Sequence, residues 1–294
     1  MPAPRLLAVS LTAALLGAAA PAPPPTSAEV LAASTPAEWR RIDPENTLYL
    51  ELPAGRVIIE LAPDFAPRHV ANIKALVRAG YFDGAAIIRS QDNYVAQWGQ
   101  PDEARPLGPA VKTLPAEFER AAAGLVFDAL PDRDTYAPEA GFSRGLPAGR
   151  DPKAGKAWML HCYGTVGVGR DEAPDSGGGT ELYAVTGQSP RHLDRNITVV
   201  GRVLQGMELL SVMPRGTGDL GFYKTPEERT PIARVRVAAD LPAAERTELE
   251  ALRTDSASFK AYVEARRNRR EAWFKRPAGA INVCNVPLPL RTPG

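Results

Sequence analysis

The chain has 294 residues, of which 44% are hydrophobic and 23% are charged, and its formal net charge is +1. This composition excludes a wholly disordered or fibrous protein, and the balanced charge argues against a nucleic-acid partner, since such binders carry a basic excess. The length suits one large domain with additions or two small domains. Proline accounts for 29 residues, about twice the usual share, which predicts many fixed irregular loops.

The first 20 residues have the pattern of a secretory signal peptide. Arg5 precedes the apolar run LLAVSLTAALLGAAA, which is shorter than the ~20 residues that a membrane-spanning helix needs. Ala18 and Ala20 supply the small residues of a cleavage site, and no Cys follows the run, which excludes a lipidated amino terminus. We expect a periplasmic mature protein without membrane contact, beginning with a linker over residues 21–45. A retained membrane anchor is the alternative.

The chain has two cysteines, Cys162 and Cys284. In an oxidising compartment a lone pair usually forms a disulfide, and this one would tie the carboxyl-terminal segment to the main body. In the chain-entropy model a loop of this length contributes about 4–5 kcal/mol. Two unrelated buried thiols are the alternative. We expect no metal site, because only three histidines occur and none has a usual ligand spacing.

Short strands separated by few helices make up the body of the chain. Alternating apolar residues predict a hairpin over residues 48–61, and the following helix begins at Pro67 and ends at Gly80. Further strands are predicted at residues 85–89, 94–97, 165–169, 182–186, 198–204 and 232–238. This order favours an antiparallel barrel over an α/β sheet.

Two segments depart from that pattern. Residues 101–160 are rich in Pro, Gly and Asp and lack periodicity, so we expect an inserted loop with one helix near residues 115–123. Residues 242–294 form a tail with helices expected at 245–253 and 256–273. The tail carries a basic run of Arg266, Arg267, Arg269 and Arg270. This run either attracts an acidic partner or is simply a solvated helix face.

A resemblance to a known family rests on two segments. The first, YFDGAAIIRSQDNYVAQWGQP (residues 81–101), is similar to the catalytic segment of cyclophilin-type peptidyl-prolyl isomerases, in which a Tyr-Phe-Asp-Gly turn leads into a strand carrying an arginine. The second, residues 164–208, contains GTVGVGR, SGGGTELYAV and LDRNITVVGRVLQGME and resembles the other half of that site. The resemblance covers residues 46–241 and implies a mainly β fold, a closed eight-stranded antiparallel barrel capped by helices.

The resemblance implies that Arg89 is the catalytic arginine and that Gln97 orients the arginine and the substrate backbone. The resemblance also implies a proline pocket with walls formed by Tyr94, Val95 and Leu193 and with Tyr183 at its floor. It implies that Gly169 and Arg170 bind the peptide backbone and that Glu181 lies beside the neighbouring subsite. His192 and Ile197 border the pocket at positions where the family usually has Trp and His. Rotation about an X–Pro bond breaks no bond, so we expect no cofactor. The expected partners of this monomeric enzyme are proline-containing peptides and unfolded proteins.

Each assignment has a structural alternative. Arg89 could be an outward strand residue paired with an acidic side chain, Tyr94 and Tyr183 ordinary core aromatics, and Gln97 a partner for backbone groups. His192 is expected to pack rather than react, because prolyl rotation transfers no proton. The SGGGT loop lacks the GxxxxGK[ST] order of a phosphate-binding loop, which predicts a flexible rim loop instead.

The sequence also departs from the family's pattern in ways that suggest a different function. Ile88 and Ile197 stand where histidines are usual, and Trp98 stands where glycine is usual. These replacements support the alternative of a non-catalytic, peptide-binding chaperone or scaffold on the same fold.

Overall fold

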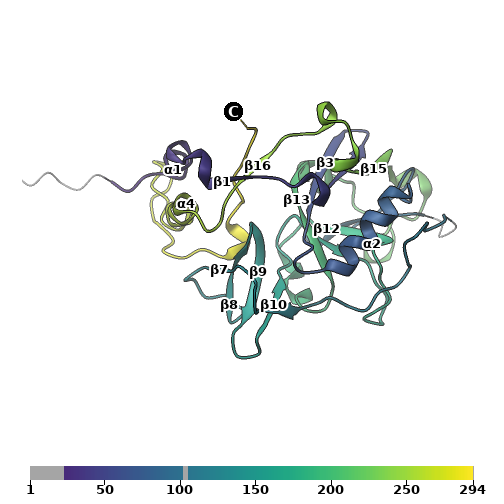
Figure 1. Cartoon of the computed structure of the whole chain (residues 1–294), viewed down its shortest axis with the longest axis horizontal. Coiled ribbons are helices and arrows are strands. Elements are labelled where there is room, and N and C mark those ends of the chain that lie inside the picture. The colour runs from purple at the N-terminus through teal and green to yellow at the C-terminus, as the bar shows by residue number, and fades with distance from the viewer. Residues whose placement is uncertain (1–22, 102–104, 294) are drawn as a thin grey trace, which may run out of the picture.

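The computed structural model describes residues 23–101 and 105–293, so the predicted signal peptide lies outside the described residues. Its main element is a curled, antiparallel nine-stranded sheet in the order β14-β4-β5-β12-β11-β13-β3-β2-β15 (Figure 1). The strands are β2 (Thr47–Leu52), β3 (Gly55–Leu61), β4 (Ala86–Ser90), β5 (Val95–Gly99), β11 (Thr165–Val168), β12 (Glu181–Val185), β13 (Val199–Gln205), β14 (Thr230–Pro231) and β15 (Arg234–Val237).

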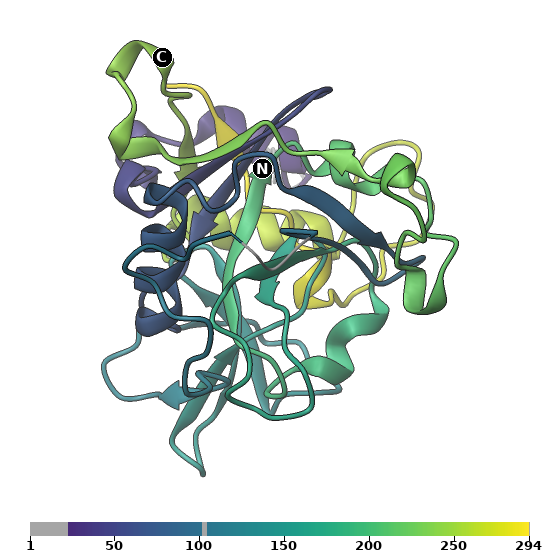
Figure 2. The same cartoon turned by 90° about the vertical axis from the view of Figure 1, so that its right-hand side faces the viewer.

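The first hairpin and the following helix form as predicted. In β2 and β3, Leu50 lies opposite Val57, and both side chains are fully buried in the main core. Helix α2 (Pro67–Arg78) begins at a proline, whose fixed φ suits the first helical position. It ends before Gly80, which takes a φ of 69°. The apolar face of α2 packs on this core, against the side of the curled sheet (Figures 1 and 2).

The sheet differs from the expected closed ring of eight strands. The reason lies in the segment 230–237. One strand was expected over residues 232–238, but the chain here divides between two partner strands. Thr230 pairs with Ile87 of β4, and the Ile232 N–H donates to the Ala85 carbonyl at 2.7 Å. From Ala233 onward the chain bonds to Glu51 and then follows β2. The result is two short edge strands, β14 and β15, and a sheet of nine.

The segment 101–160 contains a second sheet rather than a loop with one helix. Its strands are β6 (Arg120–Ala121), β7 (Asp128–Ala129), β8 (Glu139–Ser143), β9 (Leu146–Asp151) and β10 (Lys156–Met159), in the order β6-β10-β9-β8-β7. Strands β8 and β9 read EAGFS and LPAGRD, and each buries four consecutive residues, so no alternation of apolar and polar positions marks them. Gly141 is required there, because a Cβ would lie 2.1 Å from the carbonyl oxygen of Asp128. Residues 115–123 contain β6 and no helix.

The segments at both ends of the described chain pack together. Helix α1 (Ser27–Ala33) lies beside α4 (Ala257–Arg267), and β1 (Trp39–Arg41), β16 (Glu250–Leu252) and β17 (Leu290–Arg291) form a three-stranded sheet (Figure 1). The linker expected over residues 21–45 therefore holds a helix and a strand. The helix expected at 245–253 is wrong, since β16 lies there, and the helix expected at 256–273 ends at Arg267.

The remaining helices are short. They are α3 (Met207–Ser211) and the 3-10 helices η1 (Pro36–Glu38), η2 (Pro44–Asn46), η3 (Ser189–Leu193), η4 (Asp219–Gly221), η5 (Pro226–Glu228), η6 (Ala238–Asp240), η7 (Ala243–Glu245) and η8 (Val283–Asn285). Among the described residues, no helix combines the length and apolarity needed to cross a bilayer.

The predicted disulfide between Cys162 and Cys284 is present, with the sulfur atoms 2.07 Å apart. It joins η8 in the tail to the segment that precedes β11, which excludes the alternative of two separate thiols.

Candidate active site

A cavity of about 470 Å³ opens beside β4, β5 and β12. The predicted site residues that line it are Arg89, Tyr94, Val95, Gln97, Gly169, Arg170, Glu181, Tyr183, Leu193 and Ile197. His192 is not among its lining residues but stacks on Tyr94, with the ring centroids 6.2 Å apart. Residues that the sequence did not indicate also line it, namely Lys112, Val168, Asp171, Ser176, Thr180, Leu220 and Phe222.

A β-bulge aims Arg89 into this cavity. The register between β4 and β5 shifts after Ile87, so that Arg89 lies opposite Gln97. Bulges of this kind redirect a side chain and are common beside active sites. The Arg89 guanidinium donates from Nη1 to Gln97 Oε1 at 3.2 Å and from Nε to the Leu220 carbonyl at 2.7 Å. Its Nη2 donates to Gln91 Oε1, so all these partners are uncharged oxygens and not the carboxylate of the alternative interpretation.

The guanidinium of Arg89 lies in a partly apolar environment. Burial lowers the pKa of its guanidinium below the ordinary value, although an arginine this basic stays charged at neutral pH. The guanidinium carbon lies 5.3 Å from the Tyr94 ring centre and 5.1 Å from that of Phe222. Both distances suit cation–π contact, so the two rings fix the cation at the mouth of the cavity.

Gln97 connects Arg89 to the strand behind it. Its Nε2 donates to Glu181 Oε2 at 2.5 Å, while its Oε1 accepts from Arg89. Gln97 is buried, and its neighbour Tyr183 lies opposite it in the register of β5 and β12. The carboxylate therefore decides which amide atom of Gln97 faces the guanidinium.

The pocket beyond Arg89 is apolar. Val95, Tyr183 and Val185 form a buried cluster, against which Tyr94 and Ile197 pack. Burial raises the pKa of the Tyr183 hydroxyl, which therefore stays protonated. A surface of this kind accepts a small saturated ring and offers it no charge.

Helix α2 and the insert hold the glycine-rich rim loop in place. The buried Asn72 donates to the carbonyls of Val111 and Gly178, both at 2.8 Å. His69 Nε2 lies 3.2 Å from the Gly177 carbonyl, and Gly179 takes a φ of 101° against Ile73. The loop is thus a packed part of the rim, not the flexible loop that was expected.

The guanidinium of Arg170 is occupied by hydrogen bonds within the protein. Its guanidinium donates to the carbonyls of Asn196, at 3.1 and 3.0 Å, and of Asp171 and Glu172, at 2.5 and 2.9 Å. It therefore fastens the loop after β11 to the loop before β13. Neighbouring Gly169 bonds through its N–H to the Glu181 carbonyl at 2.9 Å.

The sequence did not indicate Leu220 and Phe222. They come from the segment between α3 and β14, which crosses over β4 and bonds to it through Tyr223 N–H and the Ile88 carbonyl, 3.0 Å apart. An irregular loop has no periodicity to reveal such an approach. The only local signal is that Phe222 follows a Gly-rich run, GTGDLG.

A curled antiparallel sheet with an arginine and a glutamine beside an apolar pocket agrees with the prolyl-isomerase fold and site that the sequence resemblance implies. The family model of cyclophilin type peptidyl-prolyl cis-trans isomerases matches residues 47–237, and the chain belongs to this family. It is an enzyme of the peptidyl-prolyl cis-trans isomerase class.

Known proteins agree with this assignment. A Brucella suis protein named "Probable peptidyl-prolyl cis-trans isomerase" is 31% identical over 201 residues, covering 67% of this chain and 85% of that protein. A Synechocystis protein named "Putative thylakoid lumen peptidyl-prolyl cis-trans isomerase" is 27% identical over 164 residues, which cover 51% of this chain and 39% of that protein. The crystal structure of the cyclophilin AquaCyp293 from Hirschia baltica matches with a TM-score of 0.67 and 26% identity, covering 86% of this chain and 96% of that one.

Proposed function

We propose that Arg89 is the group that accelerates X–Pro rotation in this isomerase, and that its substrates are proline-containing peptides and unfolded exported proteins. The observation that carries the proposal is the placement of its guanidinium. It lies at the mouth of an apolar pocket, bonded to uncharged oxygens and flanked by Tyr94 and Phe222. A cation held in this way keeps its charge available to a substrate carbonyl.

The chemistry requires no bond cleavage. Rotation about an X–Pro bond faces a barrier of ~18–20 kcal/mol, because resonance gives the C–N bond partial double-bond character. In the twisted state the prolyl nitrogen becomes pyramidal and recovers its lone pair. A guanidinium that holds the proline's own carbonyl and favours a hydrogen bond to that nitrogen stabilises the twisted state more than the planar one. Only such differential interactions accelerate the step.

The apolar pocket adds to this effect. The twisted amide is less polar than the planar amide, so it loses less when it leaves water. We propose that Val95, Tyr183, Leu193 and Ile197 bind the proline ring, with Tyr94 and His192 stacked at the edge, and that Gly169, Arg170 and Glu181 border the preceding residues of the peptide. A lowering of the barrier by ~5 kcal/mol would accelerate rotation several-thousand-fold.

A protease-coupled assay on a chromogenic X–Pro peptide tests the role of Arg89. We expect Arg89→Ala to lower kcat/KM by on the order of 10²-fold, because it removes the cation and leaves the pocket. The matched control is Arg234→Ala, since Arg234 is an exposed arginine on β15 outside the cavity. Wild-type activity in Arg89→Ala would overturn the proposal, and a wild type that protects unfolded protein without accelerating rotation would favour a non-catalytic chaperone.

The same proposal includes export and chain organisation. The signal pattern of residues 1–20, the disulfide and the lumenal name of the Synechocystis relative all support a mature protein in the periplasm. We propose an isomerase domain over residues 46–241, interrupted by the insert 101–160 and followed by an extension over 242–294, which acts as a monomer. Amino-terminal sequencing of the periplasmic protein and its mass by light scattering test these points.

A further inference from the structure

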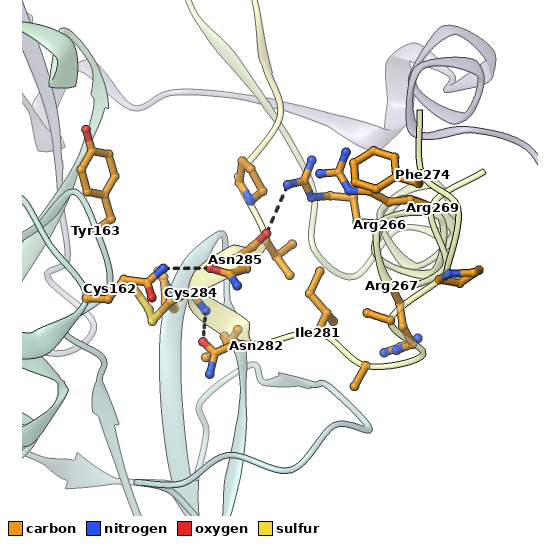
Figure 3. A pocket seen from close by; sticks show the side chains of 18 of the residues that line it. Cys162, Tyr163, Arg266, Arg267, Arg269, Phe274, Ile281, Asn282, Cys284 and Asn285 are labelled. Atoms are coloured by element: carbon orange, nitrogen blue, oxygen red, sulfur yellow. Dashed lines mark hydrogen bonds between the residues drawn. A yellow bond between two sulfur atoms is a disulfide. The ribbon is translucent and has the colours of Figure 1, made fainter. Parts of the chain in front are cut away.

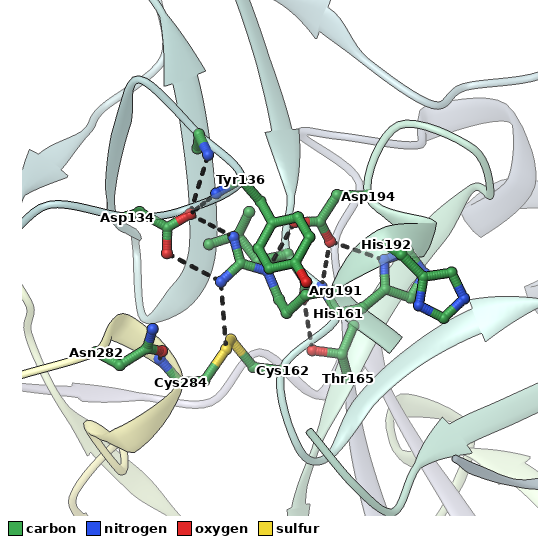
Figure 4. A network of polar contacts seen from close by, with 12 residues as sticks. Asp134, Tyr136, His161, Cys162, Thr165, Arg191, His192, Asp194, Asn282 and Cys284 are labelled. Atoms are coloured by element: carbon green, nitrogen blue, oxygen red, sulfur yellow. Dashed lines mark hydrogen bonds and ion pairs between the residues drawn. A yellow bond between two sulfur atoms is a disulfide. The ribbon is translucent and has the colours of Figure 1, made fainter. Parts of the chain in front are cut away.

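The hydroxyl of Tyr183 is hydrogen-bonded to a residue that does not line the cavity. Tyr183 presents its ring to the cavity, while its hydroxyl lies 2.9 Å from His161 Nε2 (Figure 4 shows His161). On the neighbouring strand, Gly167 pairs with Tyr183, and a Cβ on Gly167 would lie 2.2 Å from that hydroxyl. The same Cβ would lie 2.3 Å from Tyr183 Cζ, so the glycine leaves room for both the ring and the hydroxyl.

His161 is held in one orientation from its other side. The side chain is fully buried, and its Nδ1 lies 3.0 Å from Asp194 Oδ1, which also accepts the His161 backbone N–H at 2.9 Å. Because an ionised carboxylate only accepts hydrogen bonds, Nδ1 carries the proton. Nε2 then accepts a hydrogen bond from the Tyr183 hydroxyl.

The network continues to the tail. Arg191 donates from Nε to Asp194 Oδ2 at 2.7 Å and from Nη1 and Nη2 to Asp134 at 3.0 and 2.7 Å (Figure 4). The exposed fractions of these three side chains are only 3–6%. Arg191 Nη1 also lies 3.8 Å from Cys284 Sγ, so the network reaches the disulfide. Leu193, which lines the candidate active-site cavity, lies between Arg191 and Asp194 in the sequence.

We propose that His161 and Asp194 are positioning residues of the isomerase, which fix Tyr183 as the floor of the proline pocket. Without His161, the buried phenol has no acceptor behind the strand and must turn toward the cavity or draw water into it, because leaving it unpaired costs free energy. Either change takes space from the proline ring. The loss should fall mainly on KM, since Arg89 keeps its place.

A double-mutant cycle tests this inference, which rests on the proposed isomerase activity. Asn at position 161 can reproduce Nδ1 and its bond to Asp194, whereas Gln can reproduce Nε2 and reach Tyr183. We expect His161→Asn to lower kcat/KM about tenfold, mostly through KM, and His161→Gln to recover most of that loss. In a Tyr183→Phe background, the effect of His161→Asn should shrink to less than about twofold, because no hydroxyl needs a partner.

The outcomes separate the two proposals. An inactive wild type refutes the activity itself, whereas an active wild type with equal effects of His161→Asn in both backgrounds refutes only the positioning role. Failure of His161→Gln to recover activity also refutes it. Melting temperatures establish that each variant is folded, and Asp194→Asn takes the place of His161→Asn in the cycle if the latter does not fold.

A second cavity, of about 670 Å³, lies where the tail meets the body. Its lining includes Arg202, Arg266, Arg267, Arg269 and Arg276, and no Asp or Glu of the described chain is among its lining residues. Figure 3 shows Arg266 and Arg269 beside Phe274 on one side, with Tyr163 and the disulfide on the other. Three arginines of the basic run, Arg266, Arg267 and Arg269, thus line a cavity and do not form a fully solvated helix face.

Most of this positive charge lacks a carboxylate. Arg267 pairs with Asp132, but within residues 23–101 and 105–293 the other four guanidinium groups have no acidic partner at ion-pair distance. The Nε atoms of Arg202 and Arg266 are buried without a hydrogen-bond partner. Burial lowers the pKa of Arg202 to about 10, and Glu60, which acts against this effect, is already paired with Arg40 at 2.6 Å.

We infer that this cavity binds a small oxyanion carrying carboxylate or phosphate groups. Guanidinium groups without a carboxylate partner match the oxygens of both groups. Arg202 Nη1 donates to the Gly145 carbonyl at 2.8 Å and Arg266 Nη2 to the Asn285 carbonyl at 3.4 Å, but these neutral acceptors leave the positive charge without a counter-ion, which a bound anion would supply. The walls contributed by Phe274, Ile281 and Pro287 suit an organic body attached to the anionic group. This inference is independent of the isomerase activity.

Calorimetric titration at constant ionic strength with pyrophosphate and with citrate tests it. We expect saturable binding of at least one anion by the wild type, and a loss of about tenfold in affinity for Arg266→Gln. The matched control is Arg270→Gln, because Arg270 is exposed, belongs to the same run and does not line the cavity. Absence of saturable binding by the wild type at millimolar anion, or an equal loss in Arg270→Gln, would overturn the inference. Preference for pyrophosphate or citrate distinguishes the two kinds of oxyanion.

Discussion

The amide of Gln97 donates to Glu181 from the neighbouring strand at 2.5 Å, and this bond turns the amide oxygen toward Arg89. An unrestrained glutamine can present either its oxygen or its NH₂ group to a neighbour. The second choice would place donor against donor at the guanidinium. Glu181 thus controls the environment of Arg89 from the neighbouring strand.

Replacing this carboxylate should therefore slow the enzyme without unfolding it. We expect Glu181→Gln to lower kcat about three- to tenfold, because the amide of Gln97 loses its fixed orientation. The protease-coupled assay measures the effect. Glu172→Gln is the control, since Glu172 is an exposed carboxylate that does not line the cavity. Unchanged kcat in Glu181→Gln would contradict this role.

The disulfide should contribute to stability through the chain that it closes, which spans 122 residues. We expect its removal, in a Cys162→Ser/Cys284→Ser double variant, to lower the free energy of unfolding by about 2–5 kcal/mol. Denaturant titration with and without a reductant checks this. The reductant should destabilise the wild type and leave the double variant unchanged, and a wild type indifferent to reduction would refute the expectation.

Helix α4 supplies part of the core shared by the tail and the insert. Phe259 is buried and lies edge-on to Phe142, with ring centroids 5.2 Å apart. We expect Phe259→Ala to cost about 3–5 kcal/mol, as truncations of buried aromatic residues do. Lys260→Ala, at the exposed next position, should change stability little. Equal midpoints of denaturation for the two variants would show that the tail does not support the fold.

Glu38 links the amino-terminal segment to α4 and should make stability depend on pH. Hydrogen bonds from the Thr35 and Ser258 backbone N–H groups lower its pKa to about 2. A carboxyl group whose pKa is lower in the folded state stabilises the fold above its unfolded pKa, and this contribution disappears as pH falls. The wild type should therefore lose its advantage over Glu38→Gln between pH 4.5 and pH 2. Thermal melts across this range measure it, and parallel curves would be the contrary result.

Local patterns explain what could be predicted from the sequence. The hairpin of β2 and β3 follows from alternating apolar residues, and the start of α2 follows from Pro67. The adjacency of Arg89 and Gln97 in the candidate site was predictable, because both lie within one short motif and strand pairing brings them together.

The rest depends on contacts between distant segments. Strands β8 and β9 use Gly, Ala and Pro at buried positions, so no alternation marks them. Helix α1 did carry a signal, because Thr26 and Glu29 form a capping box, but its stability comes from packing on α4. The network behind Tyr183 joins residues 134, 161, 191 and 194, which no local motif relates.

The three-stranded sheet of β1, β16 and β17 bears on when the protein can finish folding. Strand β1 pairs only with β16 among the described strands. Residues 39–41 therefore cannot form their strand pairing until a segment more than 200 positions later in the sequence is present. During synthesis, the amino-terminal segment emerges long before that partner. This sheet therefore joins early and late parts of the described chain, and it cannot be complete until nearly all of that chain has been synthesised.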